Sequence, residues 1–124
     1  SEEELRKTAA YVSGVLGQTE DVPSLEPLLQ DKGRDVRWNA ALALARLGSG
    51  AGHSEIMKML DRQNLRLQEG MTEVKIEEVM VNAVKGLQLL QRQDSKPLLS
   101  SLAKDDASLK VRQAALEALK VLNA

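Results

Sequence analysis

Residues 31–48, DKGRDVRWNAALALARLG, decide the fold class. From Val36 onward, apolar side chains recur four, eight and eleven residues along the chain, and these positions lie on one face of an α-helix. Gly48 follows the last of them, where a glycine is typical of a helix end. The stretch therefore predicts an amphipathic helix over residues 36–48.

Three other segments of the chain fall into the same register. The four segments are 5–17, 36–48, 79–91 and 111–123. Each begins with an aliphatic residue, and each carries an alanine four residues later, at Ala9, Ala40, Ala83 and Ala115. Two helices can approach each other closely only where the side chains between them are small. The repeated alanine therefore indicates helices that pack side by side.

A shorter apolar segment precedes three of these predicted helices. The short segments are 23–29, 54–60 and 95–102. Pro23 and Pro97 suit the first turn of a helix, where no amide hydrogen bond is lost. A hairpin of one short and one long helix cannot bury both of its faces alone, so the pattern predicts stacked helical repeats.

The spacing of the repeats gives the predicted organisation of the chain. We expect a single repeat domain over 1–124, with a partial unit at 1–17 and full units at 21–48, 52–91 and 94–124. The third unit carries an insertion near 62–78, in which we expect a loop at 62–71 and a helix from about Thr72 to Gln91. The helix at 5–17 lacks a preceding short helix, so we expect the chain to be part of a longer protein.

The turn and helix around Val36 resemble a known family. Asp31, Val36-Arg37, Ala40-Ala41 and Leu44 are similar to the HEAT repeat of the short bacterial and archaeal type, which is related to the phycobilin lyase HEAT-like repeats. The segment from Asp105-Asp106 to Leu119 repeats the pattern. The resemblance implies an all-α fold, namely a right-handed α-solenoid of about 3.5 HEAT-like hairpins. Proteins of this family usually bind other macromolecules. The resemblance also implies that Arg6, Arg37 and Arg112 pair with an aspartate of their own or a neighbouring turn, here Asp31, Asp35, Asp105 or Asp106. The expected turn ladder consists of Asp31, Asp35, Arg37, Asp105 and Arg112.

Charge differs between the long-helix segments and the remainder of the chain. The four segments hold seven basic residues and one acidic residue, whereas the remainder holds 10 basic and 17 acidic residues. If the long helices line the concave side of a solenoid, this side is mildly basic and favours an acidic or mixed apolar partner surface. The alternative is structural, because several of these arginines occupy the ladder position.

The two aromatic residues of the chain point to a candidate binding strip. Positions two and six residues into each long-helix segment should face away from the short helices, and they include the only Tyr and the only Trp. The predicted contact residues are Tyr11, Trp38, Leu42, Val81, Lys85, Asn39 and Asn82. Trp and Tyr are enriched at the energetic centres of interfaces. Alternatives are that residues 62–71 cover the strip, or that it mediates self-association; the two asparagines would bind either a peptide backbone or neighbouring repeats.

Residues for catalysis and metal binding are sparse. The chain has no Cys and one His, His53, which lies in a glycine-rich connection. Zinc sites draw on Cys and His ligands, so neither a metal site nor a cofactor is expected. No signal peptide or apolar run of membrane-spanning length occurs. This favours a cytoplasmic location, or the soluble part of an anchored or exported protein.

These observations predict a non-catalytic module that binds another protein on the concave face of the long helices, as a scaffold. One alternative is a nucleic-acid-binding or HEAT-like lyase or glycosylase-type accessory module. Nucleic-acid binding would need a continuous basic stripe with aromatic residues that stack on bases, and the chain has few aromatics. The other alternative is a purely structural spacer.

Overall fold

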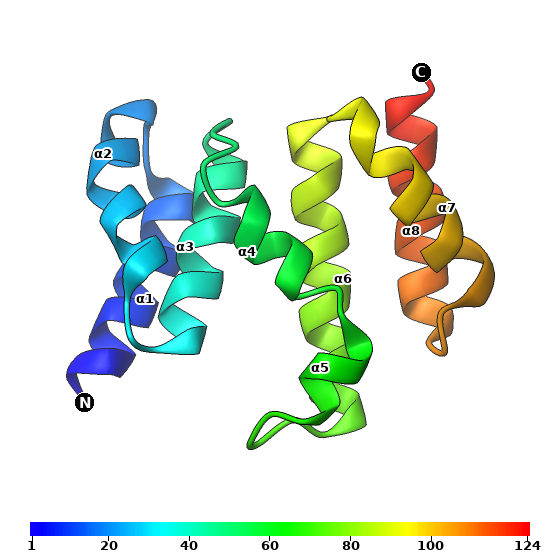
Figure 1. Ribbon diagram of the computed structural model, residues 1–124. Helices are drawn as coiled ribbons and strands as arrows, with labels where there is room; N and C mark the ends of the chain where they lie inside the picture. The colour runs from blue at the N-terminus through cyan, green and yellow to red at the C-terminus, as the bar shows by residue number, and fades with distance from the viewer. The chain divides into compact units, whose positions relative to one another are not determined.

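The segments with a helical apolar period form the long helices of the protein. The computed structural model describes residues 1–124, all of whose regular secondary structure is helical. The long helices are α1 (Glu2–Leu16), α3 (Arg34–Arg46), α6 (Glu73–Leu90) and α8 (Leu109–Leu122). The sequence-based prediction of four long helices is therefore confirmed (Figure 1). None of the helices combines the length and the apolar character that a membrane crossing requires.

Short helices lie between the long ones. They are α2 (Val22–Leu25), α4 (His53–Lys58), α5 (Arg62–Arg66) and α7 (Lys96–Asp105), with 3-10 turns η1 (Thr19–Asp21), η2 (Glu26–Gln30) and η3 (Gln93–Ser95). Pro23 and Pro97 stand within the first two positions of α2 and α7, where a proline costs no helical hydrogen bond. The predicted alternation of short and long helices is thereby confirmed.

Side-chain caps fix where three of the long helices begin. The Thr72 hydroxyl accepts a hydrogen bond from the Lys75 amide at 3.1 Å, and the Ser108 hydroxyl accepts one from the Val111 amide at 3.2 Å. Ser1 caps α1 in the same way. Each bond satisfies an amide that has no partner inside the helix. The start of α6 at Thr72 agrees with the prediction from sequence.

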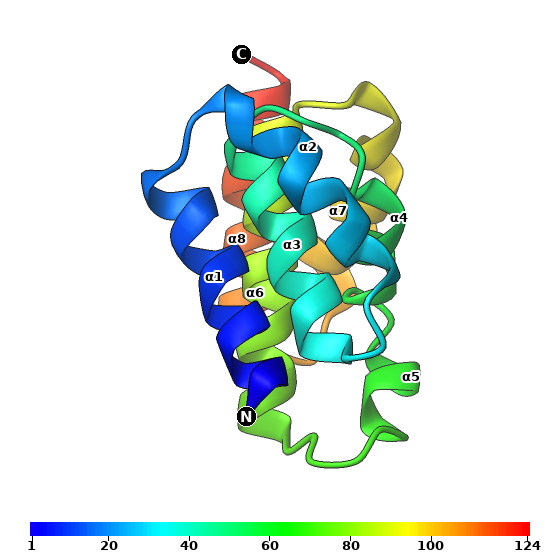
Figure 2. The same ribbon diagram turned by 90° about the vertical axis from the view of Figure 1, so that its left-hand side faces the viewer.

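The chain divides into two compact units, Ser1–Lys58 and Met59–Ala124. In the first unit, α1 runs alongside α3, and the segment formed by α2 and η2 packs against α3 as well (Figure 2). Helix α4 also contacts α3. Helix α3 is thus the centre of the first unit.

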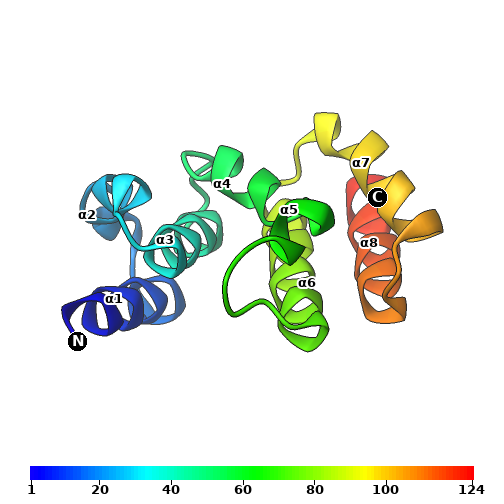
Figure 3. The ribbon, with the colours of Figure 1, turned by 60° about the horizontal axis from the view of Figure 1, so that its bottom comes forward.

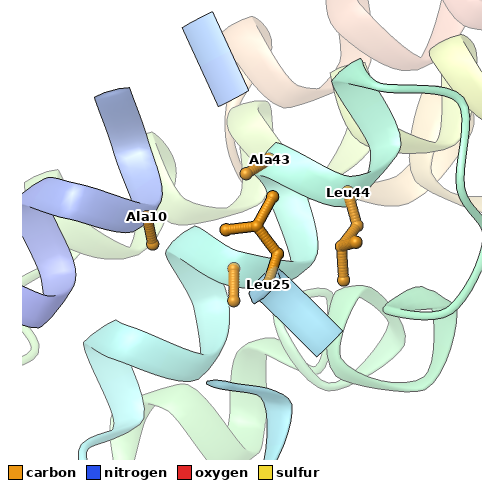
Figure 4. Close-up of a cluster of buried hydrophobic side chains, with 5 residues drawn as sticks. Ala10, Leu25, Ala43 and Leu44 are labelled. Carbon is orange, nitrogen blue, oxygen red and sulfur yellow. The ribbon is translucent and has the colours of Figure 1, made fainter. Parts of the chain in front are cut away.

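The core of the first unit is built mainly from α3. Ala40, Ala43 and Leu44 of α3 are fully buried together with Ala10 of α1 and Leu25 of α2. Figure 4 shows Leu25 reaching from its short helix toward α3, close to Ala43 and Leu44. The small residues keep the α1 and α3 backbones close, and the leucines fill the space beneath α2. The predicted register is confirmed in α3, where Val36, Ala40 and Leu44 are buried. It is wrong in α1, where Ala9 is exposed and its neighbour Ala10 is buried together with Gly14.

The second unit is organised around α8. Helices α6 and α7 both pack on α8, and α5 packs on α6. Figure 3 shows α7 against α8 in an oblique view. The largest fully buried side chains of this unit include Leu65, Ile76, Met80, Leu87 and Leu99. Aliphatic burial of this kind supplies most of the stabilisation of a helical unit that lacks aromatic residues.

The insertion differs from its prediction. Residues 62–71 were expected to form a loop, but Arg62–Arg66 form helix α5, capped by the Asp61 carboxylate, which accepts from the Asn64 amide at 3.1 Å. Leu65 anchors this turn because its side chain is completely buried. Leu67 is exposed and therefore covers no other surface. The short helix was missed because five residues are too few to show a helical period.

Candidate interaction surface

Two turns of identical geometry precede α3 and α8. The Asp31 carboxylate accepts a hydrogen bond from the Gly33 amide at 2.8 Å, and the Asp106 carboxylate accepts one from the Ser108 amide at 2.9 Å. The two aspartates also share the same extended backbone, with φ −61° and ψ 147° at Asp31 and φ −61° and ψ 145° at Asp106. The two turns therefore repeat the same backbone conformation and the same hydrogen bond.

An arginine of each helix closes its own turn. Arg37 Nη1 donates to the Asp31 carbonyl oxygen at 2.8 Å, and Arg112 Nη1 donates to the Asp106 carbonyl oxygen at 2.6 Å.

Two of the expected ladder residues need correction. Asp106 rather than Asp105 holds the second turn, because Asp105 is the exposed last residue of α7. The Asp35 carboxylate pairs with the adjacent Arg34 at 3.2 Å and takes no part in the turn.

A second arginine reaches each turn aspartate from the preceding part of the chain. Arg6 Nε and Nη2 of α1 donate to the two Asp31 oxygens at 2.7 and 3.2 Å. In the second unit, Arg62 of the inserted helix α5 makes the same two-pronged contact with Asp106, at 3.3 and 2.7 Å. Met80 occupies the position in α6 that corresponds to Arg6 in α1. The insertion thus supplies the guanidinium group that α6 lacks.

The contact between Arg6 and Asp31 makes the first unit sensitive to acid. The pKa of the Asp31 carboxyl is lowered, first because the Arg6 guanidinium donates to it and then because the Gly33 amide does. A carboxyl group whose pKa is lower in the folded than in the unfolded state stabilises the fold. This contribution to the free energy of unfolding has its full value at pH values above the pKa of the unfolded state. That stability is lost as the pH falls through the pKa of the folded state.

We therefore expect Asp31→Asn to lower the stability of the first unit at neutral pH, and the difference from wild type to shrink below about pH 4. Urea midpoints read from the fluorescence of Trp38, which lies in the same unit, measure this difference. Asp35→Asn is the matched control, because the Asp35 carboxylate pairs only with an adjacent residue. A wild-type advantage that stays constant down to pH 2 would contradict the assignment.

The predicted central aromatic contact, Trp38, is corrected by the structure. Its side chain is 6% exposed, and the Arg34 guanidinium lies 5.1 Å from the ring centroid. Ala41 and Ala45, three and seven residues further along α3, are buried on the same helical face. Trp38 therefore belongs to a buried face, and its two alanine neighbours were the sequence signal for this.

The other predicted residues of the first unit differ in accessibility. Tyr11 is 50% exposed, with the Arg46 guanidinium 5.5 Å from its ring centroid, and Leu42 is half-buried. The Asn39 side-chain amide donates to the Asp35 carbonyl oxygen of its own helix at 2.8 Å. Asn39 is thus used inside α3, so Tyr11 is the accessible member of the predicted strip in this unit.

In the second unit, two predicted residues line a groove. Val81 and Asn82 of α6 lie in a groove of about 310 Å³, whose other lining residues are Val74, Glu77, Glu78 and Lys110. Val74 is 78% exposed, and the Asn82 amide has no hydrogen-bond partner within the chain. Lys85 stands four residues beyond Val81 and is exposed. The groove combines an apolar surface with a free amide that can both donate and accept.

Sequence reasoning missed four of the six lining residues. The contact positions were taken from the repeat segments, which begin at residues 79 and 111, although the first of these helices was expected from about Thr72. Helix α6 begins at Glu73 and α8 at Leu109. The sequence did contain a pattern that indicates two of these residues. Positions 74, 78, 81 and 85 are spaced by four, three and four residues, so they lie on one face of a helix. Counting the contact positions back along the expected helix toward Thr72 would have found Val74 and Glu78.

The summed net charge of the four long helices is also less positive than that of the four sequence segments from which they were predicted. With the observed bounds, α1 and α6 each carry a net charge of −1, and α3 and α8 each carry +2. The total is +2 instead of +6, because the acidic first turns of α1 and α6 lay outside the segments. The groove itself holds two carboxylates, of Glu77 and Glu78, against one ammonium group, of Lys110.

A polar hollow in the first unit has a different character. It is lined by Arg37, Glu55 and Lys58, among others. Arg37 Nε lies 3.3 Å and Lys58 Nζ lies 3.6 Å from Glu55 Oε1, so these charges are paired with each other. This pairing uses Glu55 Oε1 and leaves Glu55 Oε2 buried without a hydrogen-bond partner. The groove on α6 offers an apolar surface beside an amide group, and it is the interaction surface that we pursue.

Comparison with known proteins adds the family. Residues 36–62, which cover most of α3 and the whole of α4, match the PBS lyase HEAT-like repeat. The chain contains a HEAT-like repeat. No curated protein and no solved structure shows significant similarity to the chain. The matched HEAT-like repeat starts at Val36 and therefore includes Arg37, the arginine that closes the Asp31 turn.

Proposed function

We propose that the protein is a non-catalytic interaction module that binds a peptide segment of another protein in the groove on α6 and α8. The observation that carries this proposal is the Asn82 amide, which has no partner within the chain and stands beside the apolar Val74 and Val81. HEAT-like repeats are often protein-interaction modules. A right-handed solenoid of about 3.5 repeats, a concave site, the lack of a cofactor and a cytoplasmic location belong to the same proposal.

The chemistry of the groove defines the segment that it would take. An amide side chain can pair with both polar groups of a peptide unit, as Asn82 would do. Val74 and Val81 favour an apolar side chain of the partner. Glu78, whose carboxylate is exposed and makes only an intrahelical contact with Lys75 at 3.5 Å, favours a basic one. The preferred ligand is thus an extended segment with one apolar and one basic side chain.

A peptide selection tests this proposal. A random peptide library displayed on phage is selected on the full chain, and enriched peptides are titrated into wild type and variants. We expect Asn82→Ala to weaken binding roughly three- to tenfold, as for the loss of one or two hydrogen bonds. We expect Val81→Asp to weaken it at least as much, because it places a charge on the apolar surface.

Asn39→Ala is the matched control. Asn39 has the same residue type and the same helical position as Asn82, but its amide is used inside α3. Its substitution should leave peptide affinity unchanged. If no peptide is enriched, or if both asparagine variants bind equally well, the groove is not the binding site. Saturable binding of a single-stranded oligonucleotide would favour a nucleic-acid module instead.

A further inference from the structure

The polar hollow of the first unit holds a buried carboxylate with one unpaired oxygen. The hollow has a volume of about 430 Å³, within the roughly 300–1,000 Å³ typical of ligand sites. Glu55, which lines it, is 8% exposed. Arg37 and Lys58 approach only the Oε1 oxygen of Glu55, and Oε2 is buried without a hydrogen-bond partner. A buried acceptor is destabilising until a donor reaches it, so the hollow favours a ligand that carries an N–H or O–H group.

The charges around the hollow favour a ligand that is also anionic. Arg37 and Lys58 contribute two positive charges to its lining, against the single negative charge of Glu55. Asp31 lines the hollow as well, but the Arg6 guanidinium donates to both of its carboxylate oxygens and balances its charge. One positive charge is therefore in excess. The Lys58 side chain is 63% exposed, so its ammonium group is accessible to a carboxylate.

The distance between the two contact points restricts the ligand further. Lys58 Nζ lies 3.6 Å from Glu55 Oε1, so the donor and the anionic group must be close together in the ligand. An ammonium group is disfavoured as the donor, because it would stand beside the like charges of Arg37 and Lys58. At the C-terminal end of a polypeptide, a neutral amide N–H and a carboxylate are attached to the same carbon atom. This group meets both requirements.

We propose that the hollow binds an acylated α-amino acid carboxylate, the group that ends a polypeptide chain. Its N–H donates to Glu55, and its carboxylate pairs with Lys58. The donor reaches the unpaired oxygen when the Glu55 carboxylate turns about its terminal bond, a torsion with a broad energy minimum. Leu29 and Ala51 in the wall of the hollow pack against the side chain of the terminal residue. All lining residues belong to the first unit, so this site is separate from the groove on α6.

Titration of the isotopically labelled full chain with three probes, followed by amide chemical shifts, tests the proposal. The probes are acetyl-alanyl-alanine, its C-terminal amide, and the depsipeptide in which an ester oxygen replaces the last N–H. We expect saturable shifts for the free acid at millimolar concentration, centred on Gln30, Ser54 and Lys58. The C-terminal amide should bind roughly tenfold more weakly because it lacks the charge. The depsipeptide should bind roughly three- to tenfold more weakly because it lacks the donor.

Two substitutions separate the contact with Lys58 from the contact with Glu55. Lys58→Ala should weaken binding of the free acid roughly tenfold and leave the C-terminal amide unaffected. Lys7→Ala is the matched control, because it removes the same charge from α1, which does not line the hollow. Glu55→Met introduces a side chain of similar length without a strong acceptor, so the preference for the peptide over the depsipeptide should disappear. If Glu55→Met alters the fold, the exposed Lys58 still provides the test.

Further probes distinguish the source of the ligand and the site that binds it. Affinity that rises from N-acetylalanine to longer acetylated peptides assigns the end of a polypeptide, whereas equal affinity assigns a small acylated amino acid. Val81→Asp, in the groove on α6, should leave the binding of all these probes unchanged. The proposal is overturned if the free acid causes no saturable shifts, or if it binds no better than its C-terminal amide or the depsipeptide.

Discussion

Arg62→Ala is expected to lower the free energy of unfolding by about 3 kcal/mol, the cost of breaking a buried ion pair. The Asp106 carboxylate is 5% exposed and the Arg62 side chain 14% exposed, so the substitution would leave a buried charge without its main partner. It would also loosen the turn that starts α8, because Asp106 holds the Ser108 amide. Urea unfolding followed by circular dichroism at 222 nm measures the effect.

Arg66→Ala is the matched control for this prediction. Arg66 lies on the same short helix and pairs with Glu73 at 2.6 Å, but both partners are about half exposed. Surface pairs of this kind contribute at most about 1 kcal/mol. If Arg62→Ala destabilises the protein no more than Arg66→Ala does, the insertion plays no part in holding the turn.

The role of Arg62 marks the limit of what the sequence could predict. The long helices were predictable because a repeated apolar period reports on packing. The repeated alanine does so in α3, α6 and α8, but in α1 Ala9 is exposed. The contact between Arg62 and Asp106 joins residues 44 positions apart and belongs to no repeat. The absence of an arginine at Met80 was visible in the sequence, but nothing local indicated which residue replaces it.

The candidate site was predictable only in part, for a geometric reason. Val81 and Asn82 are partly exposed on α6, and their contact with a partner stays a prediction. Trp38 was misplaced, because the side of α3 on which it lies is also buried. The deciding evidence came from Ala41 and Ala45, whose small side chains allow close packing beside the indole.

A side-chain difference also separates Asn39 from Asn82. Both occupy the fourth position of their segments, yet only Asn39 bonds back to its own helix, at the Asp35 carbonyl oxygen. Asparagine can satisfy its amide locally or leave it for a partner. The choice depends on rotamer and neighbours, which a repeat pattern does not encode. Substitutions of Asn39 and Asn82 can therefore be compared directly in binding experiments.

Gly14→Val is expected to destabilise the first unit by about 3 kcal/mol, the upper range for overpacking a close helix contact. A Cβ atom at Gly14 would lie 2.6 Å from both Cα and Cβ of Ala43. The α3 backbone cannot yield as a flexible side chain can, so α1 must move away from α3 and uncover Ala10. The gain in helix propensity on replacing a glycine, up to about 1 kcal/mol, does not offset this loss.

Ala9→Val provides the control, because it introduces the same branched side chain into α1 at an exposed position. Only the side chain at residue 14 would meet α3, so the difference between the two variants isolates the helix contact. Urea midpoints from Trp38 fluorescence give the difference in stability, and amide hydrogen exchange in α1 shows whether this helix detaches. Equal stability of the two variants would mean that close packing of α1 on α3 does not stabilise the first unit. A large difference confined to Gly14→Val would show that a residue without a side chain decides how closely α1 packs on α3.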